Sequence, residues 1–352
     1  MEYKSLNLGI RPNFLDLAKG FGIFIVVFWH YVWYLDIPFQ NNLLWNIEFN
    51  ISLFHMPLFF IIAGMLYKIR PIKEEIKKDV NSLLAPYLLI SVLCLIVSII
   101  MKDVSIKQFV LHITGILSGH DFFVTTPVVY AALWFVYSLF FIKIVVSFIY
   151  NCRKPISLLF IVLSILTALV TIMKGNVFPF RIDTSSIGLL FFIIGFKGKH
   201  LIERIMQKTK HLLFTAAISL IIITISALYN INYDEFRGYV SIYACLWGKS
   251  FIVYVIGGIS GTLLLFSLCS LILRLKFRNN ILVNISMNIS NGTIIILGFH
   301  GLFYPFFKGI LVSSNFFTAV GFSLFILFIC YWLIILSSKF FPILLGGRKL
   351  KT

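Results

Sequence analysis

The sequence alternates between long apolar runs and short segments that carry most of its basic residues. Of its 352 residues, 60% are hydrophobic and only 12% are charged. Soluble domains are about half apolar and about a quarter charged, so a soluble fold of this length could not bury so much apolar surface. A helix of about 20 apolar residues crosses the hydrocarbon core of a bilayer. The chain is therefore predicted to be an all-α, polytopic transmembrane helix bundle.

Ten apolar runs have lengths that suit membrane-spanning helices. They lie near residues 13–35, 47–67, 83–101, 130–150, 156–173, 186–197, 212–230, 250–273, 289–309 and 316–337. The sixth run is short, and Gly292, Gly298 and Gly301 interrupt the ninth. The connections leave no room for a soluble domain, so residues 1–352 are predicted to form one transmembrane domain. Residues 106–117 have apolar positions at helical spacing, which predicts a helix at the membrane surface.

The basic residues are unevenly distributed between the two sides of this ten-helix scheme. The loops on the side of the N-terminus hold 21 lysines and arginines, and the opposite loops hold 7. Because cytoplasmic loops are enriched in these residues, both termini are predicted to be cytoplasmic. The formal charge of +17 then reflects loops that face anionic membrane lipid, and nucleic acid is not an expected partner.

The five cysteines are isolated, and no two have the spacing of a metal site or a redox motif. They are expected to be small buried hydrophobic residues. No metal is therefore predicted.

The first apolar run contains three ionisable residues, Asp16, Lys19 and His30. Such residues are costly inside a bilayer and usually have a function. Asp16 and Lys19 are three residues apart and can pair on one helix face. Lys19 and His30 are almost three whole turns apart, so they share a face and are separated by roughly 16 Å along the axis. The bulky aromatic end of this run favours a spanning helix over a cleaved signal peptide.

The second run places a histidine near a carboxylate and a proline. His55 follows Glu48 by two helical turns, and Pro57 is expected to kink the helix and free backbone groups beside His55. This run begins at the outer side, so Glu48, His55 and His30 are expected at similar depth. A histidine with a carboxylate neighbour suits general base catalysis. Alternatively, His30 bonds between helices, the polar residues of the second run cap a kink, and Asp16 and Lys19 form a structural pair.

The chain resembles the membrane acyltransferase-3 family, and most closely its fucose 4-O-acetylase and O-acetyltransferase-like branch. The matching segments occur in the expected order along most of the chain: Lys19-Gly20 with His30, Phe54-His55-Met56-Pro57-Leu58-Phe59-Phe60 with Gly64, Ala85-Pro86-Tyr87, Leu133-Trp134-Phe135, and Ser290-Asn291-Gly292-Thr293-Ile294 with His300.

The resemblance implies an acyltransferase of the plasma membrane. Such an enzyme moves an acyl group, usually acetyl, from cytoplasmic acetyl-CoA to a hydroxyl of a surface polysaccharide or lipid-linked sugar at the outer face. The family's motif of an arginine, ten further residues and a histidine maps onto Lys19 and His30, and its essential histidine onto His30. Lysine keeps the positive charge of the arginine but lacks the planar guanidinium that can form bidentate hydrogen bonds.

Candidate roles follow for residues at both sides of the membrane. His30 is the candidate base, with His55 and Glu48 beside it as catalytic residues, and Asp16 and Lys19 are candidate substrate-binding residues. The basic residues Arg70, Lys73 and Lys77 are candidates for binding the acyl-CoA phosphates. They are equally explained as an ordinary cytoplasmic loop.

Two further residues have both a functional and a structural interpretation. Trp134 could stack on the acceptor sugar or anchor its helix at the membrane interface. His300 could complete the acceptor site or bond between helices.

A different class of function is also compatible with the sequence. In a polysaccharide exporter or transporter, the polar residues of the first helix would line a path rather than perform chemistry. Transporters more often have internal repeats and broken helices near mid-membrane. This chain has no convincing internal repeat, and its ionisable residues favour the ends of the helices. The enzyme is therefore the favoured interpretation over a transporter or a structural subunit.

Overall fold

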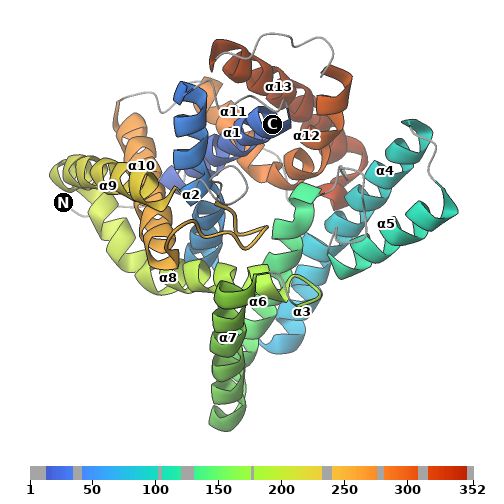
Figure 1. Cartoon of the computed structure of the whole chain (residues 1–352), viewed down its shortest axis with the longest axis horizontal. Helices are drawn as coiled ribbons and strands as arrows, with labels where there is room; N and C mark the ends of the chain where they lie inside the picture. Colours follow the sequence, from blue (N-terminus) through green and yellow to red (C-terminus); the bar gives the residue numbers. More distant parts are fainter. Residues whose placement is uncertain are drawn as a thin grey trace.

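The structure is a computed structural model that describes residues 13–34, 42–101, 105–119, 131–175, 178–231, 240–275, 281–307 and 316–346. Within these residues the protein is a helix bundle (Figure 1). Its α-helices are α1 (Phe14–Tyr34), α2 (Asn42–Leu66), α3 (Ile72–Asp79), α4 (Ala85–Met101), α5 (Ile106–Ser118), α6 (Trp134–Asn151), α7 (Lys154–Lys174), α8 (Ile182–Gln207), α9 (Thr209–Asn230), α10 (Phe251–Arg274), α11 (Ile281–Asn291), α12 (Thr293–Phe307) and α13 (Phe316–Phe340).

The predicted all-α membrane bundle is confirmed for the described part of the chain. Nine helical segments there are long and apolar enough to span a membrane. One of them, Ile72–Ile100, combines α3, the π-helical turn η1 (Val80–Leu84) and α4, so it starts before the predicted third span. The short sixth apolar run, near residues 186–197, covers only part of its helix. Helix α8 has 26 residues because it continues past the apolar run into a basic, polar end.

The ninth predicted span consists of two helices, α11 and α12, which meet at Gly292. A Cβ atom on Gly292 would lie 2.4 Å from Ile334 of α13, so the chain approaches that helix closely at the break. Gly298 lies inside α12 without ending it, and a Cβ atom on Gly298 would lie 2.2 Å from Ile90 of α4.

Helix α5 confirms the predicted amphipathic helix. Ser105 caps its first turn, accepting from the Gln108 amide while the Gln108 side chain accepts from the Ser105 amide. Gly119 ends the helix with a left-handed φ of 68°. One side of α5 is buried, including His112 and Ile116, and the other is exposed.

Several helices present apolar side chains outward, as a membrane protein must. Figure 1 shows α7 extending from the rim of the bundle. On α7, Leu158, Ile165 and Leu169 are each at least half exposed. These faces suit contact with lipid chains.

Helices α2 and α8 pack with their backbones in contact. A Cβ atom on Gly195 would lie 2.0 Å from the Ile61 carbonyl oxygen, and one on Gly64 would lie 2.0 Å from the Phe192 carbonyl oxygen. Such small residues let helices approach closely within a membrane. This contact holds α2, the helix that carries His55, against the bundle.

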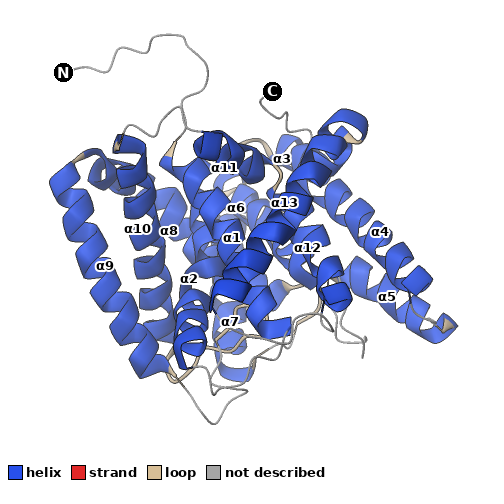
Figure 2. Cartoon of the chain, turned by 90° about the horizontal axis from the view of Figure 1, so that it is seen from above, coloured by secondary structure: helices blue, strands red, loops and turns tan. Residues whose placement is uncertain are grey.

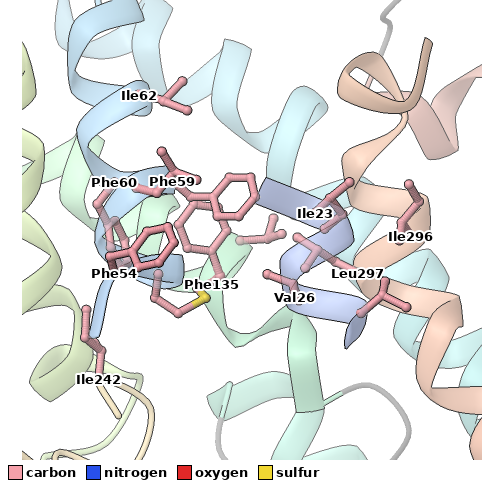
Figure 3. Packing of buried hydrophobic residues seen from close by; sticks show 14 of the residues in the cluster. Ile23, Val26, Phe54, Phe59, Phe60, Ile62, Phe135, Ile242, Ile296 and Leu297 are labelled. Atoms are coloured by element: carbon pink, nitrogen blue, oxygen red, sulfur yellow. The ribbon is translucent and has the colours of Figure 1, made fainter. Parts of the chain in front are cut away.

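Helices α1, α2 and α12 meet in the centre of the bundle. Figure 2 shows α1 between α2 and α13, with α12 nearby. In Figure 3, Phe54, Phe59 and Phe60 of α2 lie beside α1, while Ile296 and Leu297 of α12 lie on the other side of that helix. All five side chains belong to one buried hydrophobic cluster.

Candidate active site

Three histidines from separate segments of the chain gather where α1, α2 and α12 meet. They are His30 of α1, His55 of α2 and His300 of α12. His55 is 5% exposed and His300 1% exposed, while His30 is partly buried. Neutral imidazole rings tolerate such burial when their ring nitrogens find partners. The hydrogen bonds of the three rings therefore indicate what each can do.

Each of the three rings bonds to its own helix. The Nδ1 atom lies 2.8 Å from the Val26 oxygen in His30, 3.0 Å from the Ile51 oxygen in His55, and 2.6 Å from the Ile296 oxygen in His300. A carbonyl oxygen can only accept, so Nδ1 carries the proton in every case. In the neutral ring, Nε2 is then the basic nitrogen. The shared geometry presents three Nε2 atoms as potential bases.

The rings form a contiguous group. The centroids of His30 and His300 are 4.8 Å apart with the ring planes at 70°. Trp29 stacks on His55 at 5.3 Å and 20°, which places His55 at the depth of the end of α1. The expectation that His30 and His55 share a depth agrees with this stack. His300, from the far end of the sequence, contacts His30 directly.

Tyr304 fixes α12 against α1. Its hydroxyl donates a 2.7 Å hydrogen bond to the Val27 oxygen, and its ring lies 5.9 Å from that of His300. Tyr304 is one helical turn after His300, so one face of α12 carries both contacts. This bond sets the position from which His300 meets His30.

Glycines and a proline adjust the neighbouring packing. A Cβ atom on Gly22 of α1 would lie 2.6 Å from Leu58 of α2, so these two helices approach each other closely about two turns before His30. Helix α2 continues through Pro57, which packs against Gly258 of α10. Pro57 thus lies within the helix, two residues after His55.

Glu48 lies on α2, two turns before His55, and is partly buried. Seven residues correspond to roughly 10 Å along the helix axis, which is the rise between Glu48 and His55 on α2. The part of Glu48 in catalysis stays a prediction.

Asp16 and Lys19 form the predicted ion pair. The Lys19 Nζ and Asp16 Oδ1 atoms are 3.1 Å apart, and the side chains are 18% and 29% exposed respectively. The next residue, Gly20, packs directly against Ser286 of α11. The pair therefore lies in the first turns of α1, well separated along the helix from His30.

Trp134 begins α6 and is only 8% exposed. Its ring contacts Phe60 at 6.3 Å and Tyr243 at 5.9 Å, and the Arg181 guanidinium lies 4.3 Å from the Tyr243 centroid. Trp134 is thus covered by protein, and Tyr243 is the more exposed ring of the stack.

The basic residues after α2 differ in their surroundings. Arg70 donates to the buried carboxylate of Glu75 at 3.2 Å, so its charge is already paired. Lys73 and Lys77 of α3 are exposed. Of the three candidate phosphate-binding residues, these two lysines are the more accessible.

Arg70 belongs to an ionic cluster that the sequence did not reveal. Lys143 of α6 lies 3.4 Å from Glu75 and also bonds to Asp79, and both carboxylates are fully buried. Burial raises the pKa of the nearby Tyr67 hydroxyl, and the Glu75 and Asp79 charges raise it further. The signal in the sequence is a lysine inside an apolar helix together with two acids four residues apart on α3. Only the fold brings them together.

No group of three or more histidine, cysteine or acidic side chains in the described ranges could hold a metal ion. The three histidines do not converge on one point, and Trp29 lies between His30 and His55.

These features define a multi-pass membrane protein with imidazole bases buried in its helix bundle. A family model described as the acyltransferase domain of the acyltransferase-3 family matches residues 13–337. The chain belongs to that family and is a membrane acyltransferase. Comparison with curated proteins and comparison with solved structures each gave no match.

Proposed function

We propose that this acyltransferase moves an acetyl group from cytoplasmic acetyl-CoA to a hydroxyl of a surface polysaccharide or lipid-linked sugar at the outer face of the plasma membrane. The observation that carries the proposal is the His30 ring. Its Nδ1 is bound to the Val26 oxygen, which leaves Nε2 as a base within the bundle. The motifs in the sequence favour the fucose 4-O-acetylase and O-acetyltransferase-like branch.

The reaction needs one base and returns it unchanged. His30 Nε2 accepts the proton of the acceptor hydroxyl while the hydroxyl oxygen bonds to the thioester carbonyl carbon. The carbon–sulfur bond breaks, and the leaving thiolate takes the proton from the His30 imidazolium. The products are the acetyl ester and the free thiol of CoA.

The residues around His30 assist this transfer by position and charge. Trp29, stacked on His55, holds that second imidazole beside the reacting region. Glu48 lies toward the outer end of α2, where its negative charge favours the transient positive charge on the imidazoles. Trp134 supports the acceptor through Tyr243, the partly exposed aromatic ring that it contacts.

The donor is expected to bind on the opposite side. Lys73 and Lys77 are exposed cations on α3, and the CoA phosphates are strongly anionic. Lys19 occupies the position of the family's motif arginine, at the inner end of α1. Arg70 contributes by holding Glu75, which positions the start of α3.

The decisive experiment replaces His30 in cells that make the natural glycan. His30→Ala is expected to abolish the acetyl esters that mass spectrometry detects on the surface glycan, while the protein remains in the membrane at its normal amount. His200→Ala is the matched control, because His200 is 91% exposed on α8 and makes no contact with the site. This control should keep full acetylation.

Purified protein separates transfer from export when label transfer is assayed in lipid nanodiscs and glycan movement in sealed proteoliposomes. Label from acetyl-CoA should appear on the isolated, de-acetylated glycan with wild-type protein and not with His30→Ala. Normal acetylation by His30→Ala would reject His30 as the base. A wild-type protein that moves glycan across a membrane without transferring label would favour the exporter.

A further inference from the structure

We infer that His30 and His300 together recognise two neighbouring hydroxyls of the acceptor, so that the acetylated hydroxyl lies next to a second, free hydroxyl. This inference rests on the proposed function and specifies the acceptor of the same site. The attacked hydroxyl bonds to Nε2 of His30, and its neighbour donates to Nε2 of His300.

The first argument is the state of the His300 ring. Its Nδ1–H donates to the Ile296 oxygen at 2.6 Å, so Nε2 must act as an acceptor in the neutral ring. Nε2 is buried, and the described residues supply no hydrogen-bond donor to it. A buried acceptor without a donor is unfavourable by an amount that proteins usually avoid. A ligand hydroxyl would satisfy it.

The second argument is the distance between the two rings. The His30 and His300 centroids are 4.8 Å apart, and both Nδ1 atoms are occupied by carbonyls of their own helices. In each ring only Nε2 therefore remains to accept a hydrogen bond from a ligand hydroxyl. Two neighbouring rings, each with one accepting nitrogen, match two donors on adjacent carbon atoms better than a single isolated hydroxyl.

The third argument is the way in which His300 is held. Tyr304, one turn later on α12, donates to the Val27 oxygen of α1. His30 bonds to the oxygen of the adjacent residue, Val26. Hydrogen bonds to the same turn of α1 thus hold the His30 ring directly and the His300 ring through Tyr304, so the distance between the rings is fixed. A fixed separation is what recognition of a defined pair of hydroxyls requires.

The test uses the acceptor identified by glycan analysis of wild-type cells. A synthetic fragment of that glycan is compared with a fragment that lacks only the hydroxyl adjacent to the acetylated carbon. For wild-type protein in nanodiscs, kcat/KM should fall at least tenfold on the deoxy fragment. With His300→Leu, kcat/KM should be low and nearly equal for the two fragments, because the group that senses the second hydroxyl is absent.

The ratio of the two kcat/KM values separates recognition from a structural effect. A merely structural His300 would lower both values in His300→Leu and leave their ratio as in the wild type. His112→Leu makes the same change at a buried histidine on α5 and should keep the wild-type ratio. His300→Gln, whose side-chain oxygen can accept, should restore part of the discrimination.

Three results would overturn the inference. They are equal wild-type rates on the two fragments, an unchanged ratio in His300→Leu, or a ratio lost equally in His112→Leu. None of these affects the proposed function as long as the wild-type protein acetylates the parent fragment. Absence of transfer to the parent fragment would instead reject the proposed function and the inference with it.

Discussion

The hydroxyl of Tyr304 donates a 2.7 Å hydrogen bond to the main-chain oxygen of Val27, which joins α12 to α1 between residues 277 positions apart. Side-chain bonds between membrane helices typically contribute about 0.6 kcal/mol, and up to about 1.7 kcal/mol. This bond therefore contributes more to the position of α12 against α1 than to the stability of the protein. It keeps His300 beside His30.

Tyr304→Phe should change activity more than stability. Removing the hydroxyl leaves the ring in place, so the melting temperature in detergent should fall by only a few degrees, consistent with a loss of about 1 kcal/mol. Transfer should slow because α12 is no longer fixed to α1. Tyr229→Phe, at a 58% exposed tyrosine, makes the same chemical change and should alter neither measurement. Wild-type kcat/KM in Tyr304→Phe would contradict the positioning role.

Gly195→Ala should disrupt the contact of α8 with α2. The added Cβ would lie 2.0 Å from the Ile61 oxygen, and a backbone atom cannot rotate away as a side chain can. Overpacking of this kind costs about 1–3 kcal/mol. Thermal unfolding followed by size-exclusion chromatography should show a clear loss of stability.

Gly198→Ala provides the control on the same helix. The nearest atom to its added Cβ is Cδ1 of Ile202 at 3.6 Å, an ordinary contact. Alanine is a better helix former than glycine by about 1 kcal/mol, so this variant should be neutral or slightly more stable. If both glycine variants behaved alike, close backbone packing of α2 and α8 would not be important for stability.

Lys143→Met should destabilise the protein strongly. It would leave the fully buried carboxylates of Glu75 and Asp79 without their shared cation. Removing one member of a buried ionic group typically costs about 3–5 kcal/mol. Lys210→Met, at an exposed lysine of α9, should be harmless.

Neutralising the whole cluster should recover much of that loss. Combining Lys143→Met with Glu75→Gln and Asp79→Asn removes the unpaired charges, and replacing a buried ion group with neutral residues is often tolerated. Melting temperatures of the single and triple variants measure this coupling. A triple variant no more stable than Lys143→Met would argue that the ionic cluster is not the cause.

Lys19→Met should affect the donor more than the fold. Because Asp16 and Lys19 are partly exposed, their ion pair contributes at most about 1 kcal/mol. The KM for acetyl-CoA should rise by about tenfold if the ammonium contacts the donor, whereas Lys19→Arg should stay near the wild type. Asp16→Asn breaks the same pair but keeps the cation. If Asp16→Asn raised this KM as much as Lys19→Met, the pair would be structural.

The placement of the membrane helices could be predicted from local sequence, because a spanning helix satisfies its own backbone hydrogen bonds and needs only a sufficient apolar length. The ten expected runs accordingly coincide with helical segments of the structure. The sixth apolar run is short because the second half of helix α8 is polar. That half continues as helix, since hydropathy marks the membrane segment and not the end of the helix.

The sequence by itself also determined which polar residues stand out, because a histidine or lysine within an apolar run is costly and so conspicuous. His30, His55, His300 and the pair of Asp16 and Lys19 were identifiable in this way. Only the tertiary structure decided which of them meet. His30 contacts His300 directly and reaches His55 through Trp29, and Lys143 finds Glu75 and Asp79. The physical reason is that apolar length and periodicity determine where a helix forms and which face is apolar. Which helix packs against each face depends instead on close contacts at positions such as Gly64 and Gly195, and no local sequence pattern specifies those contacts.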